Sequence, residues 1–252
     1  MPVGRSRLFE LDVDALTLAE SVARCMAAVE RRERIEVAVV NAAKIIRMRQ
    51  DRGLREAVAG ADLVLADGQS VVWASRFLGA PLPERVAGID LFTGLLAAAE
   101  GDGRSVYLLG ARPEVLAATV AEVRRRHPDL AVAGSRDGYF ADDEAGAVAD
   151  AVKGSGADLL FLGMTSPKKE LFCARHGERT GAMVIHGVGG SFDVLAGLVR
   201  RAPAAWQRLG LEWLYRLLQE PRRLGPRYLE TNVKFIALAL AARFRPRTGE
   251  TT

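Results

Sequence analysis

Six short apolar runs alternate with segments of helical periodicity between residues 35 and 188. Each run is long enough for a strand and too short for a helix, and most of its residues are apolar on both alternating faces. Runs of this kind are typical of parallel strands that are covered by helices on both sides. The runs are IEVAVV (35–40), DLVLAD (62–67), SVYLLG (105–110), LAVAGS (130–135), DLLFLG (158–163) and MVIHGV (183–188).

The segments between these runs have the pattern of helices. Helical patterns cover about residues 42–50, 69–79, 113–126 and 142–156, and Pro113 stands at the start of the third. Strands that alternate with helices form βαβ units, whose crossovers are right-handed. The sequence therefore predicts an α/β fold with a Rossmann-like, mostly parallel sheet that has helices on both faces.

The pattern changes near residue 200. No further strand is visible, and helical segments cover roughly residues 203–219 and 221–242, with Pro221 at the break. Proline interrupts a helix because it lacks the N–H and collides with the preceding turn. We therefore predict two parts: an α/β core over residues 1–200 and a C-terminal helical appendage over residues 201–252.

The appendage is basic and contains interleaved aromatic residues. The chain has a net charge of +4 and a pI of about 9.3. Residues 200–229 carry seven Arg against two Glu, and Trp213, Tyr215 and Tyr228 lie among them. A local excess of positive charge indicates an anionic partner. Nucleic acid, a membrane surface and a phosphorylated substrate all fit this pattern alone.

Cysteine usage and hydropathy favour a cytoplasmic protein. Cys25 and Cys173 have no metal-type spacing, which argues against a disulfide scaffold or a zinc site. The first residues, MPVGRSRLFELDVD, lack the apolar centre of a signal peptide. The late apolar run at 235–242 is far shorter than the ~20 residues that a membrane-spanning helix needs. We expect no spanning helix.

Polar and small residues stand where the predicted strands end. Ligands of open α/β sheets bind beyond the carboxyl ends of the strands, so these residues are candidates for a site. Asp67 is placed to act as a general base, or it caps a helix. Asn41 is placed to bond a sugar hydroxyl, or it is a capping Asn. Gly110 ends the third run.

Two loops at the later strand ends could bind an anion. GVGGSFD (187–193) places small residues before a predicted helix, where backbone N–H groups can approach a phosphate; its candidate residues are Gly189, Gly190 and Asp193. The other reading is a tight turn. In GMTSPKKE (163–170), we predict Ser166 as N-cap and Pro167 as first helical residue. Lys168 and Lys169 then lie near a diphosphate, or they form a solvated first turn.

Asp12 and Asp14, in the sequence DVD, match the D-x-D pattern that holds a metal ion in many sugar-nucleotide transferases. The sequence precedes a helical pattern, ALTLAESVARCM, and we predict a helix start rather than a metal site. His186 lies inside a predicted strand and is expected to be a core residue. No metal ion and no cofactor are expected.

Several motifs occur together in one order. They are NAAKIIRMRQD, ADLVLADGQSVVWASRFLGAPLPERVAGIDL, VYLLGARPEV, DGYF, LLFLGMTSPKKELF, GVGGSFDVLAG and RAPAAWQRLGLEWLYRLLQEPRRLGPRYL. The chain strongly resembles the WecG/TagA/CpsF glycosyltransferases through these motifs. The resemblance covers about residues 8–238.

The resemblance implies an inverting, metal-independent transferase. Family members move a sugar, often N-acetylmannosamine, from UDP to a sugar on undecaprenyl diphosphate. Their products feed teichoic acid, enterobacterial common antigen or exopolysaccharide synthesis. The appendage of the family completes the active site and brings the enzyme to the membrane, which implies a peripheral protein on the inner face of the membrane, with a possible homo-oligomer.

The resemblance also assigns residues. Asp67 matches the proposed base of the family, and Asn41 matches the family Asn that follows the first strand. Arg85, in the sequence RVAG, and Asp90, shortly after it, are the other catalytic candidates. Asp90 is the next candidate for the base. The family arginines of the appendage match Arg208, Arg216, Arg222 and Arg223.

Two positions depart from the family pattern. Val39 stands where Thr is usual, and Lys169 stands where Gln is usual. The extra cation of Lys169 leads to the hypothesis of a uronate or another anionic sugar. Two other functions remain open: a catalytically inactive adaptor at the membrane surface, and a nucleic-acid-binding module. The second does not explain the residues at the strand ends, so we expect no nucleic acid partner.

Overall fold

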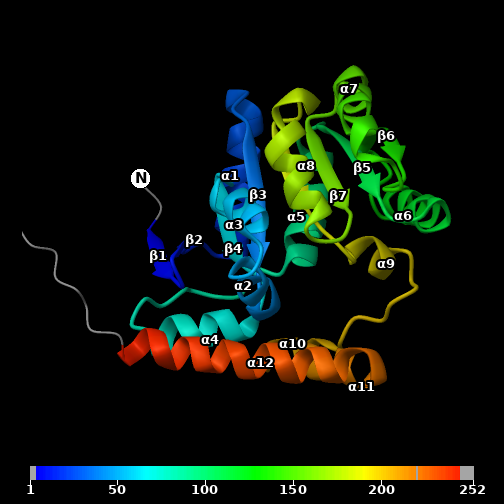
Figure 1. The fold of residues 1–252 in the computed structure, drawn as a ribbon. Coiled ribbons are helices and arrows are strands. Elements are labelled where there is room, and N and C mark those ends of the chain that lie inside the picture. The colour runs from blue at the N-terminus through cyan, green and yellow to red at the C-terminus, as the bar shows by residue number, and fades with distance from the viewer. Residues whose placement is uncertain (1–3, 220, 245–252) are drawn as a thin grey trace, which may run out of the picture.

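A six-stranded parallel sheet forms the centre of the molecule (Figure 1). The computed structural model describes residues 4–219 and 221–244. The strand order is β4-β3-β8-β7-β5-β6, and all five neighbouring pairs are parallel. The predicted α/β fold is confirmed, with strand ends within about two residues of the predicted ones. The strands are β3 (Ile35–Val40), β4 (Leu63–Ala66), β5 (Ser105–Gly110), β6 (Ala131–Arg136), β7 (Leu159–Gly163) and β8 (Val184–Gly187).

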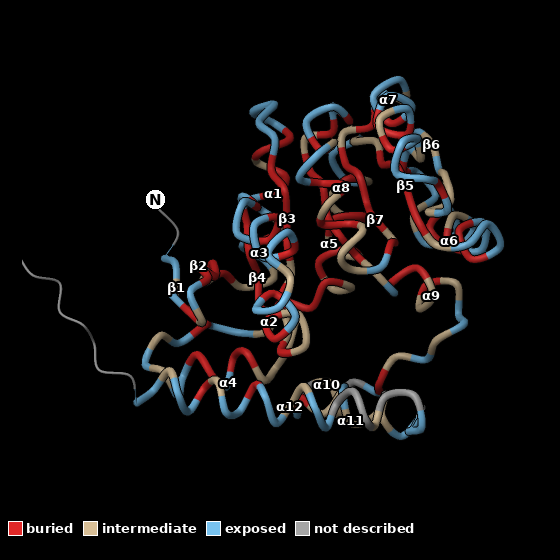
Figure 2. The backbone as a smooth tube through the Cα atoms, in the orientation of Figure 1, coloured by how far each residue is buried: buried red, intermediate tan, exposed pale blue. Residues whose placement is uncertain are grey.

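Helices cover both faces of the sheet. One face packs against α1 (Leu18–Arg31), α5 (Gly88–Gly101), α6 (Pro113–Arg126) and the short α9 (Ser191–Leu195). The other face packs against α2 (Ala42–Met48), α3 (Arg52–Ala59) and α4 (Gln69–Phe77) at β3 and β4, and against α7 (Ala145–Ser155) and α8 (Lys168–His176) at β5 and β7. Figure 2 shows the buried central strands and the exposed outer sides of the helices. Burial on both faces explains the continuous apolar runs.

The N-terminal segment is an antiparallel hairpin of β1 (Arg5–Leu8) and β2 (Leu11–Asp14). The prediction that Asp12–Asp14 starts a helix is therefore wrong. The Asp14 carboxylate accepts bonds from Arg5 Nε at 2.9 Å and Val64 N at 2.8 Å, which ties the hairpin to β4. Helix α1 begins four residues later because Thr17 and Glu20 form a capping box.

After β8 and α9, the described part of the chain continues with α10 (Ala204–Arg208), α11 (Glu212–Gln219) and α12 (Pro221–Phe244). The predicted helix over 203–219 is interrupted at Gly210, whose φ of +71° belongs to the left-handed region that favours glycine. Figure 1 shows these helices as a layer below the sheet. Two short 3₁₀ turns complete the described part of the fold, at Asp142–Glu144 and Glu178–Thr180.

Helix α12 is attached to the core through its apolar side. It packs against α2, and Phe235 and Ala239 are buried in the same cluster as Ile45 and Met48. The Phe235 ring lies 5.2 Å from that of Phe9 at the hairpin tip. Within residues 4–219 and 221–244, no helix is long and apolar enough to cross a membrane. The division into two parts at residue 200 stays a prediction.

Candidate functional site

The carboxyl ends of the strands bring the predicted site residues to one edge of the sheet. Val40 is paired with Ala66, so Asn41 and Asp67 follow neighbouring strands at the same level. Gly187 is paired with Leu162, and Gly110 with Gly163, which places the two later loops along the same edge. The sheet register therefore assembles segments that are far apart in the sequence.

Asp67 lies half-buried at this edge, directly after β4. Its Oδ1 accepts a bond from Gly88 N, the first residue of α5, at 3.0 Å. It does not cap α4, since Gly68 is the N-cap there and no side chain bonds that helix start. Among the described residues, no hydrogen bond reaches Oδ2 of Asp67, so this oxygen can accept a proton.

A buried histidine supports Asp67 through Gly88. His186 on β8 is fully buried, and its Nε2 lies 3.0 Å from Gly88 O. Burial lowers the pKa of His186 to about 4, so the imidazole is neutral near pH 7. The Gly88 carbonyl can only accept, so a hydrogen bond between the two groups requires the proton on Nε2. His186 thus holds Gly88, and Gly88 holds Asp67.

Asn41 is the N-cap of α2. Its Oδ1 accepts a bond from Lys44 N at 3.0 Å, which confirms the capping role. A Cβ at Gly68 would lie 3.0 Å from Asn41 Cβ, so the loops after β3 and β4 touch. A bond from Asn41 to a sugar hydroxyl stays a prediction.

Four charged side chains connect this edge to the appendage, and we refer to them as the seam cluster. Arg201 bonds both oxygens of Asp90, the closer pair of atoms being Nη1 and Oδ1, and Arg85 Nη1 donates to Glu212 Oε2 at 2.7 Å. Since both Asp90 oxygens are bonded to a guanidinium, Asp67 is the better placed of the two carboxylates to take a proton. The seam cluster comprises Arg85, Asp90, Arg201 and Glu212.

Comparison with protein families identifies the family of this chain. The profile of the glycosyl transferase WecG/TagA/CpsF family matches residues 6–249, nearly the whole chain. The chain belongs to this glycosyltransferase family. The match shows a transferase that acts on a sugar donor and an acceptor, as the resemblance of the motifs implied.

Lys169 of this glycosyltransferase lies inside the protein. Its ammonium bonds Glu170 Oε1, which also accepts a bond from Lys44 Nζ at 2.7 Å. Burial and the neighbouring Lys44 lower the pKa of Lys169, with Glu170 acting against them. Burial alone would raise the pKa of Glu170, but Lys44 and Lys169 outweigh it and hold that pKa at about 2. The ammonium of Lys169 is directed at Glu170, so the geometry gives the hypothesis of an anionic sugar no direct support.

Lys168 also has protein partners. Its ammonium donates to Gly138 O at 3.0 Å and Phe140 O at 2.8 Å, and it lies 3.9 Å from the centre of the Phe140 ring. The predicted N-cap Ser166 is wrong by one residue, because Pro167 caps α8 and Lys168 is the first helical residue. A role of Ser166, Pro167 and the two lysines in UDP binding stays a prediction.

Glycines allow close backbone approach at the edge. Gly110 has a φ of +140°, and a Cβ there would lie 2.4 Å from the Gly163 carbonyl carbon, so no side chain fits. Gly189 has a φ of +53°, and Gly190 is the N-cap of α9. The Asp193 carbonyl accepts bonds from the turn after α9, at residues 198 and 199. Before α9, Ser191 N bonds Val188 O at 3.1 Å, so this loop is a tight turn; anion binding by Gly189 and Gly190 stays a prediction.

The arginines of the appendage are described only in part. The side chains of Arg208, Arg216 and Arg223 lie outside the described residues, and Arg222 is exposed in the first turn of α12. Their roles toward a diphosphate stay predictions. Gly210, between α10 and α11, lies against Gln69, since a Cβ there would be 2.4 Å from Gln69 Cγ. The appendage therefore contacts the start of α4, two residues after Asp67.

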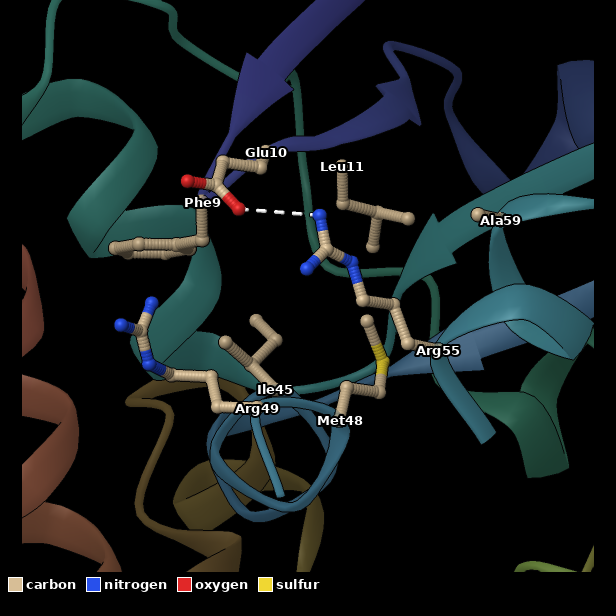
Figure 3. A pocket seen from close by; sticks show the side chains of 8 residues that line it. All are labelled: Phe9, Glu10, Leu11, Ile45, Met48, Arg49, Arg55 and Ala59. Carbon is tan, nitrogen blue, oxygen red and sulfur yellow. Dashed lines mark hydrogen bonds and ion pairs between the residues drawn. The ribbon is translucent and has the colours of Figure 1, made fainter. Parts of the chain in front are cut away.

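A separate cavity of about 120 Å³ lies at the hairpin tip, beside the last turn of α2 (Figure 3). Phe9 and Glu10 form the tip, and both have positive φ. Glu10 Oε2 lies 3.1 Å from Arg55 Nη2 across the opening. Asn41 starts α2 at its other end, so the cavity is separate from the candidate site. Its lining residues are Phe9, Glu10, Leu11, Ile45, Met48, Arg49, Arg55 and Ala59.

Sequence reasoning missed several residues of this region. Glu212 and Arg201 meet partners 127 and 111 residues away, and no local pattern reports such a pairing. His186 was expected in the core, but its contact with Gly88 requires the fold. Within the described part of the chain, no group of three or more His, Cys, Asp or Glu residues could hold a metal ion. Metal independence stays a prediction.

Proposed function

We propose that the protein is an inverting glycosyltransferase that moves a hexose from UDP to a sugar on a polyprenyl diphosphate. N-acetylmannosamine or a related hexose is the sugar that the family suggests. An acceptor hydroxyl oxygen attacks the anomeric carbon, and the bond from that carbon to the UDP oxygen breaks with its electron pair. The hydroxyl proton passes to Asp67 as the new bond forms.

One observation carries the assignment of Asp67. Its carboxylate is fixed through one oxygen by Gly88 N at 3.0 Å, and the other oxygen has no bond from a described residue. A general base must be held firmly and must still have a free lone pair for the proton. The position at the carboxyl edge of a parallel sheet is where ligands of such folds bind.

Exposed apolar residues favour a position at the membrane surface, where a polyprenyl-linked acceptor resides. Among its described side chains, helix α12 exposes five large apolar ones at spacings of three and four, which place them along one side of the helix. Amphipathic helices of this kind lie in the plane of the bilayer interface. The exposed residues are Leu229, Val233, Ile236, Leu240 and Phe244, and α4 adds Trp73 and Phe77.

The test is release of UDP in the presence of liposomes that contain the lipid-linked acceptor. Asp67→Asn keeps an oxygen for the Gly88 bond and removes the base. We expect its turnover to fall by about 10²–10⁴-fold, with UDP binding retained. Asp12→Asn, in the exposed hairpin pair with Arg7, is the matched control and should keep full turnover.

Turnover of Asp67→Asn at the wild-type rate would refute the assignment. Liposome binding without any UDP release from the wild-type protein would favour the inactive adaptor instead.

A further inference from the structure

The seam cluster is partly buried and is composed of two cations and two anions. The side chains of Arg85 and Glu212 are each 14% exposed, and their closest atoms lie 2.7 Å apart. Arg201 holds Asp90 with Nη1 and Nη2, and Arg85 Nη2 lies 4.0 Å from the same carboxylate. Two guanidinium groups therefore converge on carboxylate oxygens that come from α5 and α11.

The seam cluster adjoins the Asp67 loop. Val86 N bonds Ala66 O at 2.9 Å, one residue before Asp67. Gly88 N bonds Asp67 itself. Arg85 is thus carried by the same short segment that fixes the proposed base, at the edge where ligands of parallel sheets bind.

Glu212 lies close to Arg201 but does not form a hydrogen bond with its Nε. Arg201 Nε is buried without a hydrogen bond, and its distance to Glu212 Oε1 is 3.6 Å. A guanidinium fork binds carboxylate and phosphate oxygens by the same geometry, and phosphate offers more acceptor oxygens. An oxyanion at this position can reach the donor that Glu212 leaves without a bond.

We propose that Arg85 and Arg201 form a diphosphate-binding site, and that Glu212 occupies it while the substrate is absent. Binding of a diphosphate displaces the Glu212 carboxylate from Arg85 and releases the first turn of α11 from the core. Glu212 is thus an intramolecular competitor, and Arg201 is a substrate-binding residue. The identity of the molecule that carries the diphosphate rests on the proposed function, whereas the binding site itself does not.

Inorganic pyrophosphate is a suitable probe, because its binding can be measured by calorimetry without sugar transfer. Glu212→Gln removes the competing charge, and coupling between sites is typically about 5–150-fold. We expect this variant to bind pyrophosphate at least about fivefold more tightly than the wild type, and Arg201→Gln to bind it more weakly by a similar factor. Glu230→Gln, in an exposed pair with Lys234 on α12, is the matched control and should bind as the wild type does. Equal affinity of wild type and Glu212→Gln overturns the proposal.

The wild-type sequence around Glu212 provides a second readout. Trp206 and Trp213 lie on α10 and α11 on either side of Glu212, and a Trp73→Phe background removes the remaining tryptophan. Pyrophosphate should change their fluorescence as the first turn of α11 leaves the core. Binding with unchanged fluorescence overturns the proposal, and this measurement decides even where Glu212→Gln does not fold.

The two possible carriers of the diphosphate are distinguished by the same variants. Tighter UDP binding by Glu212→Gln identifies the donor. Unchanged UDP binding with a lower KM for the lipid acceptor identifies the acceptor. If pyrophosphate shows the expected affinity and fluorescence changes but no sugar is transferred, the result supports the site and counts against the proposed function alone.

Discussion

Glu170 is a buried carboxylate that pairs with two buried lysines. Lys44 Nζ lies 2.7 Å from its Oε1, the Lys169 ammonium bonds the same oxygen, and the Glu170 side chain is 6% exposed. Glu170→Gln keeps the size of the side chain and removes its charge, which leaves two buried ammonium groups without an anion. We expect a large loss of stability, since breaking a buried ion pair on one side costs about 3–5 kcal/mol.

The pKa gives a second route to the magnitude. Lowering the pKa of Glu170 from 4.5 to about 2 stabilises the ionised form by about 3 kcal/mol, at about 1.4 kcal/mol per tenfold change in proton affinity. Because the folded pKa is the lower one, this stabilisation is present above pH 4.5 and is lost as the pH falls toward 2. The two routes agree on about 3 kcal/mol near pH 7.

Urea unfolding followed by circular dichroism measures this difference. We expect Glu170→Gln to lose about 3 kcal/mol of unfolding free energy at pH 7, and the gap to the wild type to narrow between pH 4.5 and 2. Glu56→Gln, in an exposed pair with Arg52, is the control and should leave the midpoint unchanged. A Glu170→Gln protein as stable as the wild type at pH 7, or a gap that does not depend on pH, would refute the reasoning.

Two further predictions concern the charge of the leaving group and the membrane. UDP release should survive EDTA, because arginines and backbone N–H groups can stabilise the departing diphosphate; strict dependence on a divalent ion would show that a carboxylate site was overlooked. The double variant Ile236→Glu and Leu240→Glu, on the exposed side of α12, should no longer sediment with anionic liposomes. Its control is Lys234→Gln on the same helix, and sedimentation of the double variant at the wild-type level would exclude this side of α12 as the membrane contact.

Much of the fold could be predicted because its strands are buried on both faces. The run IEVAVV matches β3 from end to end, and SVYLLG matches β5. The hairpin at residues 5–14 was missed for two physical reasons. Its strands are four residues each, and its tip consists of Phe9 and Glu10 with φ of 53° and 66°, a conformation for which Asn and Gly are the usual signal.

The candidate site was predictable only where a local rule applies. Asp67 and Asn41 follow strands, and the rule for parallel sheets places both at one edge. Arg85 meets Glu212 127 residues away, and Glu170, the neighbour that Lys169 bonds, also meets Lys44 126 residues away, so no window of the sequence contains these two long-range contacts. Lys169 was expected near a diphosphate for this reason, whereas it bonds Glu170 inside the protein.

The position of β8 has a consequence for how the molecule is made. β8 is the last strand in the sequence, yet it lies between β3 and β7. It pairs with Ile35 on one side and with Leu159 on the other. During synthesis, β3 and β4 can pair early, and β5, β6 and β7 can form a second unit, but the two halves share no strand contact until β8 enters between them. His186 arrives with that strand, so the support beneath Asp67 is completed in the same late step that joins the sheet.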